Sequence, residues 1–194
     1  MIPPEPSFGL VNGRPLFLDL HADSYFMLEA RDEADLLRAL RSEDPSSSTR
    51  PVAFTRPTAQ LQTSGATSLL RLTDVWLVGL TLRQIRRSLA RKPLALVIAG
   101  AQAKRARRGT TVSPRLLANR FTASRRWLPQ TPNCLTDSLA LLAFLARHGA
   151  TAELVFGAKL DPFAAHCWVQ VDTLLLNDSI DRIEPFTPVA VIAA

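Results

Sequence analysis

The stretch from Asn133 to Asp178 constrains this chain more than any other, because it carries a thiol, an imidazole and a carboxylate in a fixed order. These groups belong to Cys134, His166 and Asp178. Apolar residues recur at helical spacing from position 135 to 146, so the pattern predicts a helix with Cys134 in its first turn. There, unpaired backbone N–H groups and the positive end of the helix dipole favour the thiolate, which is the nucleophilic form of cysteine.

Three short β-rich runs follow this helix, at residues 152–156, 165–171 and 174–176. They predict antiparallel strands after the helix. Side chains alternate along a strand, which places His166 and Cys167 on opposite faces. With a three-residue turn at 171–173, His166 lies opposite Asp178, and with a two-residue turn it lies opposite Ser179. In either register, Asp178 is within reach of the imidazole.

A nucleophile at a helix N-terminus, a base on a facing strand and a carboxylate on the next strand are typical of a Cys-His-Asp hydrolase or acyl-transferase. In this hypothesis Cys134 attacks, His166 is the general base and Asp178 holds the imidazole tautomer. Asp172 and Asp181 are alternatives to Asp178, although a turn explains Asp172 better. The alternative for Cys134 is a buried, inert thiol, and that for His166 is a core histidine.

Further predictions concern the surroundings of these three residues. Cys167 is expected to be a small core residue that faces away from the site. Gln130 lies four residues before Cys134 and is a candidate donor to an oxyanion. A closed zinc site is not expected, because His166 and Cys167 point apart and Cys134 with Asp178 supplies too few ligands. No cofactor is predicted.

The stretch resembles the transglutaminase-like leader peptidases of lasso-peptide biosynthesis, the B proteins of those gene clusters. The matching segments are Cys134-Leu135, Ser138-Leu139-Ala140-Leu141, Leu145-Ala146-Arg147, residues 152–157, residues 162–169 and Leu176-Asn177-Asp178. The spacings between Cys134, His166 and Asp178 are also similar to those of the family. One departure is Cys167, where an alanine is more usual.

This resemblance implies a cysteine peptidase that removes the leader from a ribosomally made precursor. A separate ATP-dependent, asparagine-synthetase-like cyclase would then close the freed amine onto an acidic side chain. It also implies a transglutaminase-like or papain-like α+β domain, here at residues 111–194. Two alternatives stay open: a thiol acyl-transferase whose thioester is resolved by an amine, and a non-enzymatic module that binds an acidic peptide or nucleic acid while Cys134 is inert.

Residues 1–80 predict a separate small domain with a three-stranded antiparallel sheet. The predicted strands are residues 8–11, 16–20 and 24–28, followed by an amphipathic helix at 31–42. Asn12-Gly13 between the first two strands is a strong hairpin signal. A sheet this small needs helices over one face.

This order of elements resembles the winged-helix-like peptide-recognition domain of peptide-modifying gene clusters, similar to the small peptide chaperone of pyrroloquinoline quinone biosynthesis. In that family the leader peptide adds to the sheet as a further strand. The resemblance therefore implies leader binding at the third strand, by Tyr25, Phe26, Met27 and Leu28.

A basic helical connector is predicted at residues 81–110, within helices expected at 67–90 and 94–108. No acidic residue lies between Asp74 and Asp137, whereas arginines and lysines are frequent there. Such a surface is either a solvated helix face or a site for an acidic partner. Nucleic acid is not expected, because no stacking aromatic residues alternate with the arginines.

With 194 residues, 47% of them hydrophobic and 21% charged, the composition predicts a globular protein. No apolar run approaches the roughly 20 residues that span a bilayer, and the first residues lack the features of a secretory signal. A cytoplasmic protein with no membrane partner is therefore expected. Two cysteines are too few for a disulfide framework.

Overall fold

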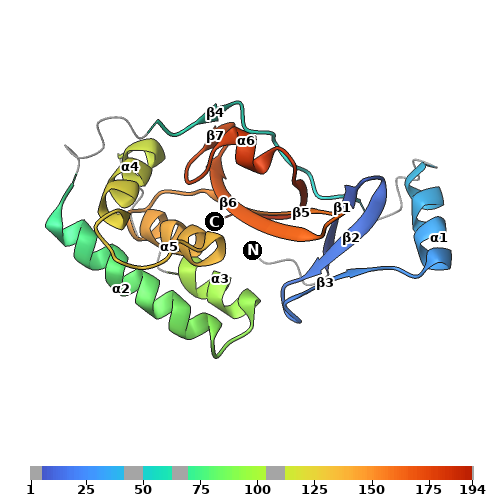
Figure 1. Ribbon diagram of the computed structural model, residues 1–194, viewed down its shortest axis with the longest axis horizontal. Coiled ribbons are helices and arrows are strands. Elements are labelled where there is room, and N and C mark those ends of the chain that lie inside the picture. The colour runs from blue at the N-terminus through green and yellow to red at the C-terminus, as the bar shows by residue number, and fades with distance from the viewer. Residues whose placement is uncertain (1–5, 42–49, 63–69, 104–111, 194) are drawn as a thin grey trace.

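The computed structural model describes residues 6–41, 50–62, 70–103 and 112–193, which form two sheets and a layer of helices (Figure 1). The strands are β1 (Ser7–Val11), β2 (Arg14–Asp19), β3 (Ser24–Met27), β4 (Ala59–Gln60), β5 (Glu153–Lys159), β6 (Ala164–Val171), β7 (Leu174–Leu175) and β8 (Thr187–Ala193). The helices are α1 (Ala30–Arg41), α2 (Leu72–Leu89), α3 (Leu94–Gln102), α4 (Pro114–Arg125), α5 (Cys134–Arg147) and α6 (Ile180–Ile183). The predicted α+β class is confirmed.

The N-terminal sheet has the predicted three antiparallel strands, in the order β1-β2-β3. Asn12 and Gly13 form the turn between β1 and β2 with φ values of 53° and 79°, and glycine and asparagine tolerate this left-handed region. Phe17 stacks on Phe8 at 4.9 Å and on Phe26 at 5.1 Å between ring centroids, so one aromatic row crosses all three strands. The opposite face packs into the main core.

The second sheet has the order β4-β7-β6-β5-β8, and only the β4–β7 pair is parallel. Gln170 pairs with Leu175 and Val171 with Leu174. The turn between β6 and β7 therefore has two residues, Asp172 and Thr173, which is the shorter of the two turns considered from the sequence. Asp178 consequently lies beyond the end of β7, and its side chain approaches His166 from there.

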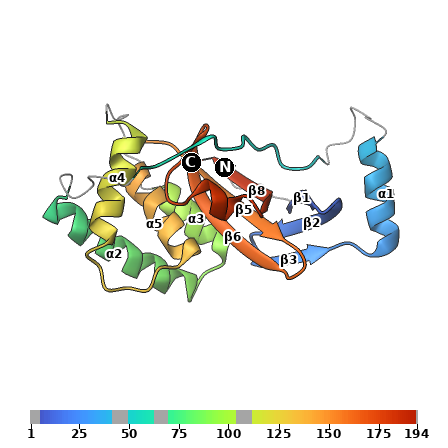
Figure 2. The same cartoon turned by 45° about the horizontal axis from the view of Figure 1, so that its top comes forward.

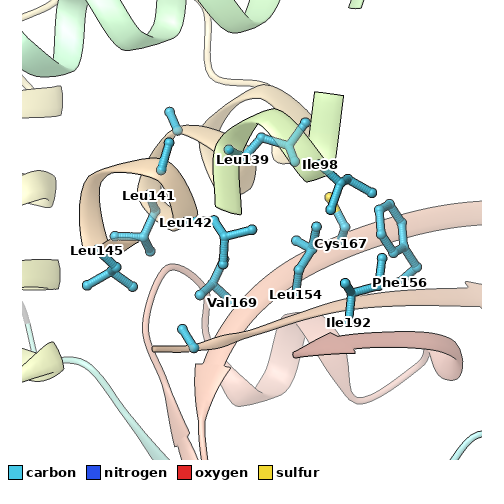
Figure 3. Close-up of a cluster of buried hydrophobic side chains, with 14 of the residues drawn as sticks. Ile98, Leu139, Leu141, Leu142, Leu145, Leu154, Phe156, Cys167, Val169 and Ile192 are labelled. Atoms are coloured by element: carbon cyan, nitrogen blue, oxygen red, sulfur yellow. The ribbon is translucent and has the colours of Figure 1, made fainter. Parts of the chain in front are cut away.

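Helix α5 packs on one face of this sheet, with α2, α3 and α4 around it (Figures 1 and 2). Every residue from Ser138 to Ala146 is buried, because α5 is enclosed by the sheet on one side and by helices on the other. Figure 3 shows Leu139 and Leu142 of α5 in one apolar cluster with Leu154 and Val169 of the sheet. This packing fixes the position of the N-terminus of α5 above β6.

Helix α2 belongs to this helical layer and is tied to α4 by a buried ion pair. Nε and Nη2 of Arg120 each donate to a carboxylate oxygen of Asp74 at 2.8 Å. The domain boundary predicted at residue 80 falls inside α2. The first residues of the helix predicted at 67–90 and the end of that predicted at 94–108 lie outside the described residues.

The two sheets meet where β1 passes β8. A Cβ on Gly9 would lie 2.0 Å from the carbonyl oxygen of Pro188, so the two backbones approach closer than any side chain allows. Leu16 and Leu18 of the N-terminal sheet join the same core cluster as Ile192 of β8. Helix α1 lies at the far end from the helical layer and has no buried residue (Figure 2).

Candidate active site

Cys134 is the first residue of α5, as predicted, and the residues around it fix this helix start. The side chain of Asn133 caps the helix, since its Oδ1 accepts a hydrogen bond from the backbone N–H of Thr136 at 3.0 Å. The backbone N–H of Asn133 donates to Asp137 at 3.1 Å. Arg125 of α4 also binds Asp137, at 2.8 Å, so the end of one helix holds the beginning of the next.

Arg125 also orders the loop that leads to Cys134. Its guanidinium donates to the carbonyl oxygens of Leu128 at 3.3 Å and Gln130 at 3.0 Å. Both carbonyls precede the helix. The chain therefore enters α5 along a path held by one half-buried arginine.

His166 of β6 lies beside Asp178, as predicted. His166 Nε2 is 2.5 Å from Asp178 Oδ2, and the two side chains are 10% and 6% exposed. The other carboxylate oxygen of Asp178 accepts from the backbone N–H of Ser179 at 2.9 Å and lies 3.5 Å from Nε of Arg182. Both carboxylate oxygens of Asp178 therefore have polar partners, and one of these partners is the imidazole of His166.

Aromatic rings enclose the imidazole. The ring of Phe186 lies 5.2 Å from that of His166, and Trp168 lies 6.2 Å away on the same face of β6. Gly157 pairs with His166 on the neighbouring strand, and a Cβ there would come within 2.9 Å of both Trp168 and Phe186. The small residue thus leaves room for the aromatic wall that keeps water from the His166–Asp178 pair.

A polar network connects the three segments that carry these side chains. Ser138, one turn after Cys134 on α5, donates to the carbonyl oxygen of Cys167 at 3.2 Å. The side chain of Asn177 donates to Ser138 Oγ at 2.8 Å and accepts from the backbone N–H of Val169 at 2.8 Å. The sequence patterns predicted no role for Ser138 or Asn177. Ser138 lies one helical turn after Cys134, and Asn177 directly precedes Asp178. This proximity to predicted site residues is the feature of the sequence that could have indicated a role.

The prediction that Cys167 faces away from the site is wrong. Cys167 is a core residue, 3% exposed, and it does lie on the opposite face of β6 from His166. That face, however, is the one covered by α5. Cys134 packs against the core cluster that contains Cys167, and both Cys167 and His166 lie close enough to lower its pKa.

These contacts shift the pKa of each group. Hydrogen bonds with Cys167 and then His166 lower the pKa of Cys134 to about 4, although burial opposes the change. Hydrogen bonds with Asp178 and Cys134 raise the pKa of His166 to about 9. Burial acts to raise the pKa of Asp178, but the hydrogen bonds from His166 and Ser179 lower it overall. At neutral pH the site therefore holds a thiolate and an imidazolium.

The other predicted site residues lie farther from this pair. Gln130 lines a pocket with Asn133 and Thr136, and Cys134 is not among the residues that line it. Asp172 occupies the β6–β7 turn with a φ of 50°, as expected of a turn residue. Asp181 is exposed on α6. Of the three aspartates considered, Asp178 alone is hydrogen-bonded to His166 within the described chain.

Strand β3 pairs with β2 on one side, and no described strand pairs with its other edge. The ring of Tyr25 meets that of Phe163, in the turn between β5 and β6, edge-on at 5.5 Å. Met27 packs on the core with Tyr25, whereas Phe26 points to the opposite face and is 38% exposed. Leu28 follows the strand. The predicted leader-binding residues therefore lie beside the strand hairpin that carries His166.

Within the described ranges, no three His, Cys, Asp or Glu side chains are grouped so as to hold a metal ion. None of the described helices combines the length and apolar character needed to cross a bilayer.

A cysteine at the start of a helix that packs on a largely antiparallel sheet, with a histidine from that sheet and an aspartate from the segment after β7, is typical of a transglutaminase-like architecture. Residues 74–191 match the transglutaminase-like superfamily, and the chain belongs to this family.

One curated relative is the Microcin J25-processing protein McjB of Escherichia coli, which is 34% identical over 58 residues. The match covers 30% of this chain and 28% of McjB. No solved structure matches the chain.

Proposed function

We propose that this chain is a cysteine peptidase that removes the leader of a lasso-peptide precursor. The observation that carries the proposal is the contact between the Cys134 thiol and His166, whose Nε2 lies 2.5 Å from Asp178. The partial similarity to a microcin-processing protein supports the choice of substrate class. Membership of the transglutaminase-like superfamily supports thiol chemistry on a carbonyl.

In the proposed reaction, the Cys134 thiolate attacks the carbonyl carbon of the last leader residue. The His166 imidazolium then donates its proton to the departing core amine, which leaves a thioester between the leader and Cys134. Water, deprotonated by the now neutral His166, hydrolyses the thioester and frees the leader. Asp178 keeps the Nδ1 nitrogen of His166 directed at Cys134 throughout. The backbone N–H of Cys134 and the side chain of Gln130 are proposed to stabilise the oxyanion.

The leader is proposed to bind as a fourth strand at the open edge of β3. An unpaired edge supplies backbone donors and acceptors to an extended peptide. Tyr25, Phe26, Met27 and Leu28 would then contact leader side chains. The edge-on contact between Tyr25 and Phe163 supports this assignment, because it joins β3 to the hairpin that bears His166.

The product of this cleavage is a core peptide with a free amine, and an ATP-dependent asparagine-synthetase-like cyclase is proposed to close it into a macrolactam. The reaction is proposed to occur in the cytoplasm. Genes for a short precursor and for such a cyclase are expected beside the gene for this chain.

A transglutaminase-type acyl transfer is a second candidate, and membership of the transglutaminase-like superfamily favours it. The same thioester would form on Cys134, but an amine rather than water would resolve it. Mass spectrometry of the leader product separates the two reactions, since hydrolysis leaves a free carboxylate and transfer leaves an amide.

The test incubates the purified chain with the precursor peptide read from the neighbouring open reading frame. Wild-type protein is expected to yield two fragments, leader and core, whereas Cys134→Ala protein, folded by circular dichroism, is expected to yield none. Cleavage by Cys134→Ala at the wild-type rate would contradict the proposed mechanism. Binding of the precursor without cleavage by the wild-type chain would favour a non-enzymatic binding module.

A further inference from the structure

The two cysteines of the chain lie in contact across the interface between α5 and β6. Cys134 begins α5, and Cys167 follows His166 on β6. Ser138 Oγ binds the carbonyl oxygen of Cys167 at 3.2 Å, which brings the first turn of α5 onto this part of the strand. Cys134 packs against the core cluster that contains Cys167, and each thiol shifts the pKa of the other, which places the two side chains beside one another.

The two thiols differ in access and in charge. Cys134 is half-buried, whereas Cys167 is 3% exposed and packed in the core between α5 and the sheet. A small oxidant from solvent therefore reaches Cys134 first. Cys134 is also the thiolate, while the hydrogen bond with Cys134 and burial raise the pKa of Cys167 and keep it protonated.

We propose that Cys134 and Cys167 form a redox modification site that reacts with hydrogen peroxide to give an intramolecular disulfide. In the first step, the Cys134 sulfur attacks one peroxide oxygen, an S–O bond forms, the O–O bond breaks, and hydroxide leaves and takes a proton to become water. Cys134 is now a sulfenic acid. In the second step, the Cys167 sulfur attacks the Cys134 sulfur, the S–S bond forms, the S–O bond breaks, and the departing oxygen takes the Cys167 proton to leave as a second water.

The first step prepares the second. The negative charge of Cys134 contributes to the raised pKa of Cys167, and that charge disappears when Cys134 becomes a sulfenic acid. Cys167 then ionises more readily beside an electrophilic sulfur. Because Cys167 lies in contact with Cys134, this reaction competes with further oxidation of Cys134 to the irreversible sulfinic acid.

A dithiol reductant reverses the modification by thiol–disulfide exchange and restores both thiols. The disulfide removes the nucleophile that the proposed peptidase requires, so oxidation would stop cleavage reversibly. Only this loss of cleavage rests on the proposed function. Formation of the disulfide itself rests on the contact between the two cysteines.

The experiment treats the purified full chain with one equivalent of hydrogen peroxide and follows its mass and its thiols. The wild-type chain is expected to become about 2 Da lighter through loss of two hydrogens. Both thiols should become resistant to N-ethylmaleimide, and a peptide digest should contain a cross-link between Cys134 and Cys167. Dithiothreitol should reverse all three changes.

Two variants separate the roles of the thiols. Cys167→Ser retains the nucleophile but lacks the second thiol, so peroxide should drive Cys134 to the sulfinic acid, about 32 Da heavier, and dithiothreitol should not reverse it. Cys134→Ser retains only the buried thiol and should remain unmodified at the same peroxide dose. Wild-type chain unfolded in guanidinium serves as the control, because unfolding separates the two cysteines.

The proposal is overturned if the folded wild-type chain accumulates sulfenic or sulfinic acid on Cys134 while Cys167 still reacts with N-ethylmaleimide after unfolding. Formation of the disulfide in a chain that does not cleave the precursor would contradict the proposed function alone. Cleavage of the precursor by a chain that forms no disulfide would contradict the redox site alone.

Discussion

At the scale of single residues, the site depends on two charges that each make the other more favourable. Hydrogen bonding with Cys167 and His166 lowers the pKa of Cys134, and hydrogen bonding with Asp178 and Cys134 raises the pKa of His166. Because the two groups interact, their titrations belong to the pair rather than to either residue. The charged pair is the form that can attack a carbonyl and then protonate the amine that leaves.

This electrostatic coupling predicts a bell-shaped dependence of kcat/KM on pH. The rate should rise through about pH 4, where Cys134 loses its proton, and fall through about pH 9, where His166 loses its own. Initial rates of precursor cleavage from pH 3 to 10 measure both limbs. An acidic limb near the ordinary cysteine pKa of about 8.5 would show that no thiolate–imidazolium pair forms in the free enzyme.

Asp178→Asn should reduce kcat by on the order of 10²- to 10⁴-fold, because an amide no longer selects the productive imidazole tautomer. The loss of the carboxylate also removes the main cause of the raised His166 pKa, so the alkaline limb of the pH profile should move to lower pH. Asp181→Asn, an exposed change on α6, is the matched control and should leave both quantities unchanged. A damaging Asp181→Asn together with a neutral Asp178→Asn would reverse the assignment.

At the scale of elements, periodicity predicted the long helices and strands to within a few residues. The helix at Cys134 and the strand at His166 follow from local patterns of apolar residues. Strand β4 and helix α6 did not follow, since they have two and four residues and depend on tertiary contacts. Strand β8 was not predicted either, although its residues form an apolar run that is typical of a strand.

The contact of Cys167 shows a limit of such patterns. Alternation along β6 correctly placed His166 and Cys167 on opposite faces. It could not show that α5 covers the Cys167 face, so that Cys134 lies beside both residues at the N-terminus of α5. Asn177 and Ser138 escaped assignment for the same reason, because their hydrogen bonds join segments distant in the sequence.

The proposal that the leader binds at the open edge of β3 can be tested with two substitutions of Phe26. Phe26→Pro should weaken binding of the leader peptide to the full chain by about tenfold or more, because proline removes a backbone donor from the strand. Phe26→Leu keeps apolar bulk and should have a smaller effect, limited to its stack on Phe17. Isothermal titration calorimetry measures both variants, and thermal unfolding verifies that each is folded. Equal binding by the two variants would place leader recognition elsewhere, with the basic connector at 81–110 as the next candidate.

At the scale of the whole molecule, the N-terminal sheet and the second sheet share one core, and the backbones of β1 and β8 approach closely at Gly9 and Pro188. The proposed binding of a leader at β3 and the proposed cleavage at Cys134 therefore require that the sheets keep this arrangement. Helix α2 packs on α4 and α5 rather than on the N-terminal sheet. Residues 1–80 alone would thus expose surfaces that are buried in the full chain.

A substitution at Gly9 tests the close approach of β1 and β8. A methyl group at Gly9 would lie 2.0 Å from the carbonyl oxygen of Pro188, and backbone on both sides leaves no flexible side chain to move away. Gly9→Ala is therefore expected to lower the free energy of unfolding by about 1–3 kcal/mol, the usual cost of overpacking. It should also raise the KM for the leader-bearing precursor, because β3 and the active site no longer lie in register.

Gly100→Ala in α3 is the matched control. No atom lies within 4 Å of the Cβ it would gain, and its helix is exposed at this position. Alanine is favoured over glycine in a helix interior, so this variant should be more stable by about 0.5–1 kcal/mol and should cleave normally. Thermal unfolding and precursor cleavage measure both glycine variants. Equal stability of Gly9→Ala and the wild type would mean that β1 and β8 separate without cost, and that the N-terminal sheet moves independently of the candidate active site.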